Sequence, residues 1–321
     1  MLRTLQRAQL AVVICMALAC VAWAGPTYTF QSVINPGDPA FTQLLGINNH
    51  STIAGYFGDG TVVPNNGFTL VLPNTFTPEN FPGSVQTQVV GINGHGDTAG
   101  FWIDTGGTNH GFTNIGGSFT NVDFPNSTSV LTQLLGINNS NEVAGYWQNG
   151  GGTQFPFMAQ GTVFKGLDPI LPPNTSAQAT GVNNAGTIVG FLVDGTGTHG
   201  FLMLKGHVGT TLNFPGSTFT QFLGVNNLGD AVGVYMVGTA THGFLYNGKT
   251  FASIDDPNGV GTTLVNGVND KGQLVGFYVD ANGNTIGFVA NPPGIPEPGT
   301  LALLGSGILA GLGFSRRRLS R

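Results

Sequence analysis

The sequence predicts an all-β protein, a six-bladed β-propeller. Three observations support this: a repeat of fixed length, four strand-like segments in each repeat, and one repeat divided between the two ends. Each repeat begins with a Gly-hydrophobic-Asn-Asn or closely related motif. The leading glycines are Gly46, Gly91, Gly136, Gly181, Gly224 and Gly267, spaced by 45 residues at first and by 43 in the last two intervals. A constant period of roughly this size is the signature of propellers and solenoids.

Within a repeat, short segments rich in Val, Ile, Phe and Tyr predict four strands. In the fourth repeat they cover residues 178–182, 187–193, 200–204 and 210–214. The first turn reads Asn183-Asn184-Ala185-Gly186, and these residue types tolerate the left-handed backbone of tight hairpins. We therefore interpret the repeated asparagines as turn formers and not as ligands. Gly-aromatic pairs such as Gly145-Tyr146 and Gly200-Phe201 are interpreted as core packing between sheets.

The two ends of the body complete one another. The last repeat, from Gly267, supplies three strands before Asn291-Pro292-Pro293, and residues 30–33 align with the fourth strand of an earlier repeat. A linear array has no reason to divide a repeat in this way, whereas a ring gains by pairing its first and last strands. Closure also removes exposed strand edges. We predict six four-stranded blades within residues 25–291.

Charge is scarce and unevenly placed. Only 8% of the 321 residues are charged, against about 25% in ordinary proteins, and every arginine lies near an end. Residues 25–291 hold four lysines and fourteen carboxylates, a formal net charge of −10. An acidic body without arginine is a poor match to phosphate backbones, which argues against nucleic-acid binding.

The N-terminus is typical of a secretory signal peptide, predicted for residues 1–24. Arg3 and Arg7 precede an apolar run, and Ala22-Trp23-Ala24 before Gly25 forms a small-x-small site for signal peptidase between Ala24 and Gly25. The alternatives are a membrane anchor, for which the run is short, and a lipoprotein modified at Cys20. Because Cys15 and Cys20 are the only cysteines, the mature chain is expected to have no disulfide.

The C-terminal tail, residues 292–321, has three parts in order. Pro296-Glu297-Pro298 is followed by an apolar segment, 299–314, and then by Arg316-Arg317-Arg318. The apolar segment predicts a transmembrane helix of about 24 Å whose arginines stay in the cytoplasm. The alternative is a helix buried in the body.

This tail resembles the PEP-CTERM sorting signal of Gram-negative bacteria. The resemblance implies recognition of Pro296, Glu297 and Pro298 by an exosortase, with Arg316, Arg317 and Arg318 as the retention cluster. It also implies cleavage near the motif and a final location in the cell envelope, on the cell surface or in secreted form, with an association with exopolysaccharide and biofilm matrix. The repeats, in which Gly-hydrophobic-Asn-Asn and His-Gly-Phe recur over residues 27–290, resemble the HAF family of extracellular repeats.

Candidate metal ligands are few and scattered. His110, His199 and His242 stand one per repeat, which favours hydrogen bonds to neighbouring loops over a metal site. Acidic residues Asp59, Asp104, Asp194 and Asp280 precede the third strand of their repeats, and we interpret them as turn formers, with calcium as the alternative. No metal, cofactor or catalytic residue is predicted.

Two functions remain open. The first is a non-enzymatic, exported propeller that contributes to the matrix or binds a glycan. The second is an exported polysaccharide hydrolase or lyase with acids converging on a central channel. No nucleophile motif or close acid pair supports the second. Glu142 stands out, but Asp97 and Asp230 hold the same place in their repeats, and we expect a solvent-facing residue there.

Overall fold

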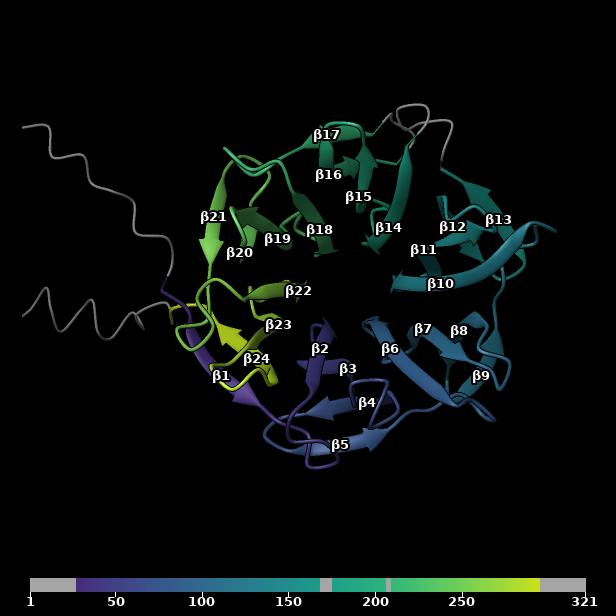
Figure 1. Ribbon diagram of the computed structural model, residues 1–321, viewed down its shortest axis with the longest axis horizontal. Helices are drawn as coiled ribbons and strands as arrows, with labels where there is room; N and C mark the ends of the chain where they lie inside the picture. The colour runs from purple at the N-terminus through teal and green to yellow at the C-terminus, as the bar shows by residue number, and fades with distance from the viewer. Residues whose placement is uncertain (1–26, 168–174, 206–208, 295–321) are drawn as a thin grey trace, which may run out of the picture.

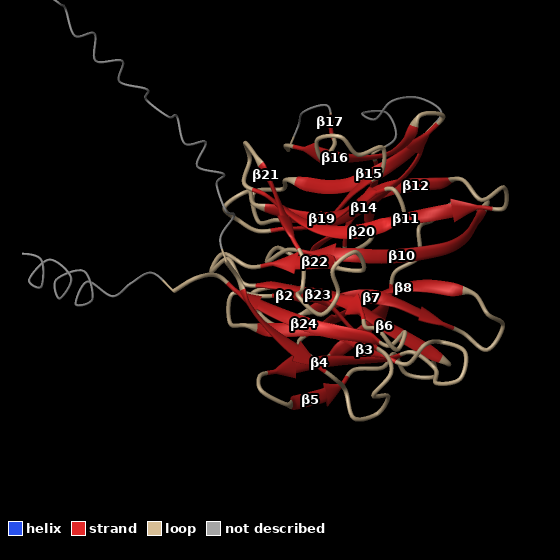
Figure 2. Cartoon of the chain, turned by 60° about the vertical axis from the view of Figure 1, so that its left-hand side comes forward, coloured by secondary structure: helices blue, strands red, loops and turns tan. Residues whose placement is uncertain are grey.

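The computed structural model describes residues 27–167, 175–205 and 209–294 and confirms the six-bladed propeller. Six four-stranded antiparallel sheets surround a central axis (Figure 1). Turning the molecule by 60° shows only strands and loops in the described chain (Figure 2). Accordingly, the described residues contain no helix with the length and hydropathy of a membrane span. The predicted helix at 299–314 lies outside the described residues.

The first three blades each use four consecutive strands, from the axis outward. Blade 1 comprises β2 (Thr42–Ile47), β3 (Thr52–Phe57), β4 (Asn66–Val71) and β5 (Thr75–Pro78). Blade 2 comprises β6 (Gln86–Ile92), β7 (Thr98–Ile103), β8 (Asn109–Ile115) and β9 (Ser118–Asn121). Blade 3 comprises β10 (Ser129–Ile137), β11 (Glu142–Asn149), β12 (Gln154–Gln160) and β13 (Val163–Gly166).

The remaining blades follow the same order except at the end. Blade 4 comprises β14 (Ser176–Val182), β15 (Ile188–Asp194), β16 (Gly197–Met203) and β17 (Thr210–Leu212). Blade 5 comprises β18 (Thr220–Val225), β19 (Ala231–Val237), β20 (Ala240–Tyr246) and β21 (Phe251–Ile254). Blade 6 comprises β22 (Leu264–Val268), β23 (Leu274–Val279), β24 (Thr285–Asn291) and, from the other end of the chain, β1 (Thr29–Val33).

Ring closure occurs as the divided repeat predicts. β1 pairs antiparallel with β24 over five residues, from Thr29 opposite Asn291 to Val33 opposite Gly287. Figure 1 shows the purple β1 beside the yellow β24 at the outer edge of blade 6. All six sheets are completed by residues between Thr29 and Asn291.

The leading glycines of the repeat lie where the six inner strands come closest to the axis. Each inner strand has a register shift immediately before its glycine, so the strand bends at the same place in every blade. A Cβ on Gly136 would lie 2.9 Å from the Cα of Gly181, and one on Gly224 would lie 2.5 Å from the Asn266 carbonyl oxygen. Glycine is therefore required by the narrow waist of the ring.

The core lies between neighbouring blades and is formed by the phenylalanines of the third strands. Phe68, Phe112, Phe157, Phe201, Phe244 and Phe288 are all essentially inaccessible to solvent. A glycine of the second strand faces each of these positions: at Gly100, an added Cβ would lie 2.9 Å from the Phe112 ring. This confirms that the Gly-aromatic pattern encodes inter-blade packing.

Deleting residues 25–34 tests closure, because it removes β1 and exposes the edge of β24. We expect the truncated body to lose cooperative unfolding or to aggregate, since an unpaired strand edge recruits other chains. Deleting residues 295–321 is the matched control and should leave unfolding of the body unchanged. Denaturant unfolding followed by tryptophan fluorescence and light scattering measures both. A β1 deletion that unfolds like the intact body would contradict closure through this strand pair.

Candidate functional site

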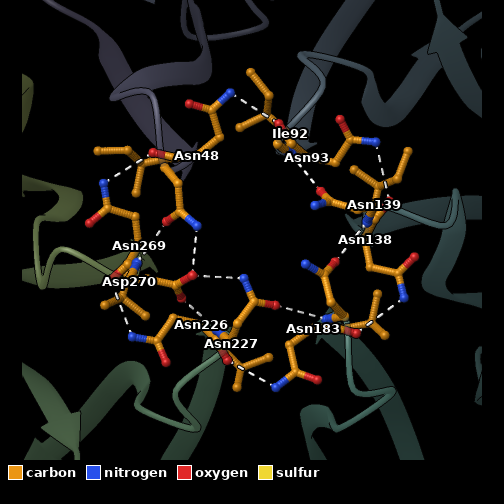
Figure 3. Close-up of a pocket in the computed structure, with 18 residues that line it drawn as sticks. Asn48, Ile92, Asn93, Asn138, Asn139, Asn183, Asn226, Asn227, Asn269 and Asp270 are labelled. Atoms are coloured by element: carbon orange, nitrogen blue, oxygen red, sulfur yellow. Dashed lines mark hydrogen bonds between the residues drawn. The ribbon is translucent and has the colours of Figure 1, made fainter.

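A closed ring of asparagine side chains surrounds one mouth of the central channel (Figure 3). In each blade the first Asn of the repeat motif donates its side-chain N–H to the backbone carbonyl of the same Asn in the next blade. The six residues are Asn48, Asn93, Asn138, Asn183, Asn226 and Asn269, and the bonds measure 2.9–3.2 Å. The last bond, from Asn269 to Asn48, joins the final blade to the first.

The same asparagines also hold their own turns. The side-chain oxygen of Asn183 accepts hydrogen bonds from the backbone N–H groups of Ala185 and Thr187, and the other five repeat this pattern. The residue at the fourth turn position has positive φ, glycine in four blades and Ser51 or Asn141 in the others. The turn interpretation is therefore confirmed. The additional bond to the next blade had no separate signal in the sequence.

The second motif position adds an outer set of contacts at this mouth. The side-chain oxygen accepts the backbone N–H of the equivalent residue in the preceding blade at 2.7–2.9 Å in five of the six interfaces. Gly94 has no side chain, so the set is broken there. Asp270 accepts further bonds from the amides of Asn49 and Asn227. Although burial acts to raise the pKa of Asp270, these bonds lower it overall.

Glu142 belongs to this network. Its carboxylate accepts a hydrogen bond from Asn138 at 2.7 Å, as Asp97 accepts one from Asn93 and Asp230 one from Asn226. The predicted equivalence of the three acids is confirmed. The expectation that Glu142 faces solvent is wrong in part, because its side chain is half-buried by this bond.

The channel itself is too small for a sugar or peptide substrate. Two cavities lie along the axis, one at the asparagine ring and one at the glycine waist, and each encloses about 70 Å³. Ligand sites for small molecules usually enclose about 300 Å³ or more. Asp270 is the one carboxylate among the residues that line these two cavities. Convergence of several acids on a channel substrate is therefore not the arrangement seen here.

The three repeated histidines bind side chains of nearby loops. His110 lies 2.8 Å from Asp123, His242 lies 3.0 Å from Asp255, and His199 contacts Thr196 and Asn213. Burial acts to lower the pKa of His110, but the carboxylates of Asp123 and Asp104 raise it overall. No group of three or more metal-ligating His, Cys, Asp or Glu side chains occurs among the described residues. The loop-binding interpretation of these histidines is confirmed.

The repeated aspartates of the second hairpin also act as turn formers. Asp59 accepts backbone N–H groups of Thr61, Val62 and Val63, and these bonds, led by that from Thr61, lower its pKa to about 2. Asp104, Asp194 and Asp280 accept N–H groups two residues ahead in the same way. Their carboxylates are thus engaged in local structure.

A groove of about 420 Å³ lies between blades 2 and 3. These blades are neighbours in the teal and blue part of Figure 1. The groove follows the outer strand β9 and faces the outer half of blade 3. Its apolar lining includes Val122, Val143 and Phe164, and its polar lining includes Thr113, Asn121, Asp123, Gln160 and Thr162.

The groove lies where a small third-strand residue meets small residues of the next blade. The third-strand residue that follows the core phenylalanine faces the next blade. It is threonine in blades 1 and 2, as Thr69 and Thr113, but Met158, Leu202, Leu245 and Val289 in blades 3 to 6. Opposite Thr113, blade 3 presents only Val143 and Ala159. Sequence reasoning missed this site, because alignment of the repeats does not show which residues face Thr113.

Asp123 joins the groove to a polar network on blade 2. It accepts a hydrogen bond from Asn121 and contacts His110, whose ring stacks on Trp102 with centroids 4.7 Å apart. The Trp102 indole N–H donates in turn to Asn121. Amide, carboxylate and imidazole groups at one end of the groove are therefore held in fixed positions.

A second deviation occurs in the loop between blades 5 and 6. Asp256 takes the place of Phe81, Phe124 and Phe214 in other inter-blade loops, and it is fully buried. One carboxylate oxygen accepts the Asn258 N–H, while Oδ2 has no hydrogen-bond partner among the described residues. Burial raises the pKa of Asp256.

The predicted processing sites lie outside the described residues. This applies to Ala24 and Gly25 at the signal cleavage site, to Pro296, Glu297 and Pro298, and to Arg316, Arg317 and Arg318. Comparison with known families does bear on the tail: the family model for the PEP-CTERM protein-sorting motif matches residues 294–318. The chain carries a PEP-CTERM sorting motif. Such a signal indicates an exported protein that is targeted to an exosortase at the cell envelope or surface.

Comparison with solved structures supports the fold alone. An AofleA triple mutant from Arthrobotrys oligospora aligns with TM-score 0.52 and 12% identity over 83% of this chain and 88% of its own. A lectin mutant from Aleuria aurantia in complex with Fucα1-6GlcNAc gives 0.48 and 11% over 81% and 99%. A prolyl endopeptidase gives 0.43 and 15% over 79% of this chain and 40% of its own. No curated protein matches the sequence.

Replacing Asp256 with Asn tests the buried acid; Asn35 occupies the same place before blade 1. Since the folded pKa of Asp256 is raised, the wild type is destabilised as pH rises from the unfolded value, about 3.9, through the folded value. We expect D256N to raise the free energy of unfolding by about 1 kcal/mol at pH 7 and to lose this advantage in acid. Denaturant unfolding at both pH values measures it. A D256N gain that is the same at both pH values would contradict a charge-based cause.

Proposed function

We propose that this protein is an exported, exosortase-processed component of the extracellular matrix whose propeller binds neutral sugar units of an exopolysaccharide without cleaving them. The groove between blades 2 and 3 is the observation that carries the binding part of this proposal. The sorting motif carries the placement at the cell surface or in secreted form. Signal peptidase acting after Ala24 supplies the first processing step in this scheme.

The chemistry of the groove matches a sugar ring. A pyranose has apolar C–H faces and hydroxyl groups around its edge. Val122, Val143 and Phe164 offer an apolar surface, and amide and hydroxyl side chains such as Asn121 and Thr162 donate and accept hydrogen bonds beside it. The volume of about 420 Å³ lies within the usual range for small-molecule sites.

The charge of the groove favours a neutral sugar. No lysine or arginine lines it, and its single carboxylate, Asp123, repels uronic acids and sulfated sugars. The body as a whole has the same sign, with a formal net charge of −10 over residues 25–291. The ligand class is therefore a neutral hexose or deoxyhexose unit of a polysaccharide.

Binding without hydrolysis is supported by the same lining. Glycoside hydrolysis ordinarily needs two carboxyl groups about 5–10 Å apart, one on each side of the scissile bond. Asp123 is the one acid among the residues lining the groove. The Aleuria aurantia lectin was solved with fucose-containing ligands, but the likeness to this chain is one of fold, so the sugar class is argued from the groove itself. The HAF-like repeats agree with an extracellular role.

Filling the groove tests the binding site. Thr113→Met introduces the side chain that blade 3 carries at the same position, Met158, and we expect it to weaken polysaccharide binding roughly tenfold or more. Thr69→Met makes the same change in blade 1 and should leave binding unchanged. Isothermal titration of the body with neutral oligosaccharides of the host matrix measures both. Equal affinities for wild type and T113M would reject this groove, whereas a wild type that binds no glycan would reject the proposed function.

Processing depends on the tail alone in this proposal. Fusing residues 292–321 behind an unrelated exported domain should give an anchored precursor and a shorter released product in a host with an exosortase. Replacing Pro296, Glu297 and Pro298 with alanine should leave the precursor in the membrane, because Arg316, Arg317 and Arg318 resist passage through it. Immunoblots of membrane and medium fractions distinguish these products. Release in a host without exosortase would show general proteolysis instead.

A further inference from the structure

The interface between blades 1 and 2 differs in chemistry from the other five. Three positions meet at every interface. One is the residue at the end of the fourth strand or directly after it, and the other two lie on the second and third strands of the next blade. At blades 1 and 2 these are Glu79, Thr98 and Asn114.

At the other interfaces the same three positions are apolar and join the hydrophobic clusters. The equivalents are Val33, Ile53 and Leu70; Val122, Val143 and Ala159; Leu167, Ile188 and Met203; Leu212, Ala231 and Tyr246; Ile254, Leu274 and Ala290. The cluster between blades 1 and 2 contains none of its three counterparts. Three polar residues have therefore replaced three apolar ones at a single, shared place, which we call the polar triad.

The three residues of the triad are hydrogen-bonded to one another, but the cluster has fewer hydrogen-bond donors than its buried oxygen atoms require. Thr98 is fully buried and Glu79 is 9% exposed, and one oxygen of Glu79, Oε1, accepts both the Thr98 hydroxyl and the Asn114 amide. The Asn114 Oδ1 atom is buried and has no hydrogen-bond partner among the described residues. Its amide cannot be turned to satisfy it, because the turn would lose the bond to Glu79 and bury an unpaired N–H instead.

The charge of Glu79 is likewise unbalanced. Among the described residues, no lysine, arginine or histidine lies within ion-pair distance of it. A nearly buried carboxylate without a positive partner is costly, and so is a buried acceptor without a donor. A single positively charged ion that binds oxygen would offset both costs at once.

We propose that the polar triad binds a hard cation, calcium in the extracellular setting, in the interface between blades 1 and 2. Glu79 supplies the charged ligand and Asn114 a neutral amide oxygen, with Thr98 positioning the carboxylate through its hydroxyl. Carboxylate and amide oxygens are ligands that Ca²⁺ prefers, and water completes the 6–8 contacts. With one carboxylate, the dissociation constant falls in the weak extracellular class, about 0.1–1 mM.

Cation binding at this place couples to stability of the ring, because its ligands come from two blades. A cation that binds only the folded body shifts the unfolding equilibrium in proportion to its saturation. At 10 mM CaCl₂ and a dissociation constant of about 1 mM, the shift is roughly tenfold in favour of the folded state. Mg²⁺ demands a stricter octahedral geometry and dehydrates reluctantly, so we expect a much smaller shift from it.

Denaturant unfolding of the body, residues 25–291, tests the proposal in 10 mM CaCl₂, in 10 mM MgCl₂ and in NaCl of matched ionic strength. The wild type should gain roughly tenfold in the unfolding equilibrium constant with CaCl₂ only. Glu79→Gln keeps the size of the side chain and removes the charge, so its response to calcium should be lost. Glu142→Gln is the matched control: it removes an equal charge from a half-buried glutamate that also accepts an asparagine amide, and its calcium response should equal the wild type's.

A second variant guards against loss of folding in E79Q. The triple change Glu79→Val, Thr98→Val and Asn114→Leu restores apolar residue types seen at the other interfaces and should fold without any response to calcium. An equal gain from MgCl₂, a wild type insensitive to calcium, or a triple variant that responds like the wild type would each overturn the proposal. Because none of these measurements uses a glycan, they stand apart from the test of the proposed function.

Discussion

The structure depends on the way one blade is attached to the next at the axis. In each of six asparagines, the side-chain oxygen accepts backbone N–H groups of its own turn. The side-chain N–H donates to the backbone carbonyl of the next blade's asparagine, so every turn is held by the blade before it. This arrangement requires the inner strands to approach within contact of one another, and the glycine at each waist position permits it. The Gly-hydrophobic-Asn motif of each repeat therefore answers one geometric constraint, the close approach of neighbouring inner strands at the axis.

Because the six interfaces between blades are built from equivalent contacts, an interface whose residues differ from the others is informative. Where Thr113 meets only Val143 and Ala159, the interface keeps its strand pairing and opens a groove. Where Glu79, Thr98 and Asn114 replace three apolar residues, the interface keeps its geometry and gains a charge. Asp256 is a third such departure. The repeat absorbs these changes because the six central hydrogen bonds and the core phenylalanines do not depend on them.

The architecture could be read from the sequence because it is encoded redundantly. The six motifs, their spacing and the divided last repeat each specify the same ring, and β1 pairs with β24 as the alignment of residues 30–33 requires. The sites could not be found in the same way. A groove forms where side chains from two blades leave space unfilled. The small size of Thr113 therefore matters only once Val143 and Ala159 are known to face it. The triad joins residues 79, 98 and 114. These residues meet only because the outer strand of blade 1 packs against the second and third strands of blade 2.

Closure also brings the two ends of the body together. The chain enters β1 at Thr29 and leaves β24 at Asn291, and these two residues are paired in blade 6. Any anchor that follows Asn291 therefore holds the ring by blade 6. In Figure 1 blades 2 and 3 lie across the central axis from blade 6, so the groove opens on the opposite side of the ring from the point of attachment. In the proposed scheme, a propeller held in this way presents its groove away from the anchor before cleavage, and cleavage near Pro296 frees the body without touching the strands that close it.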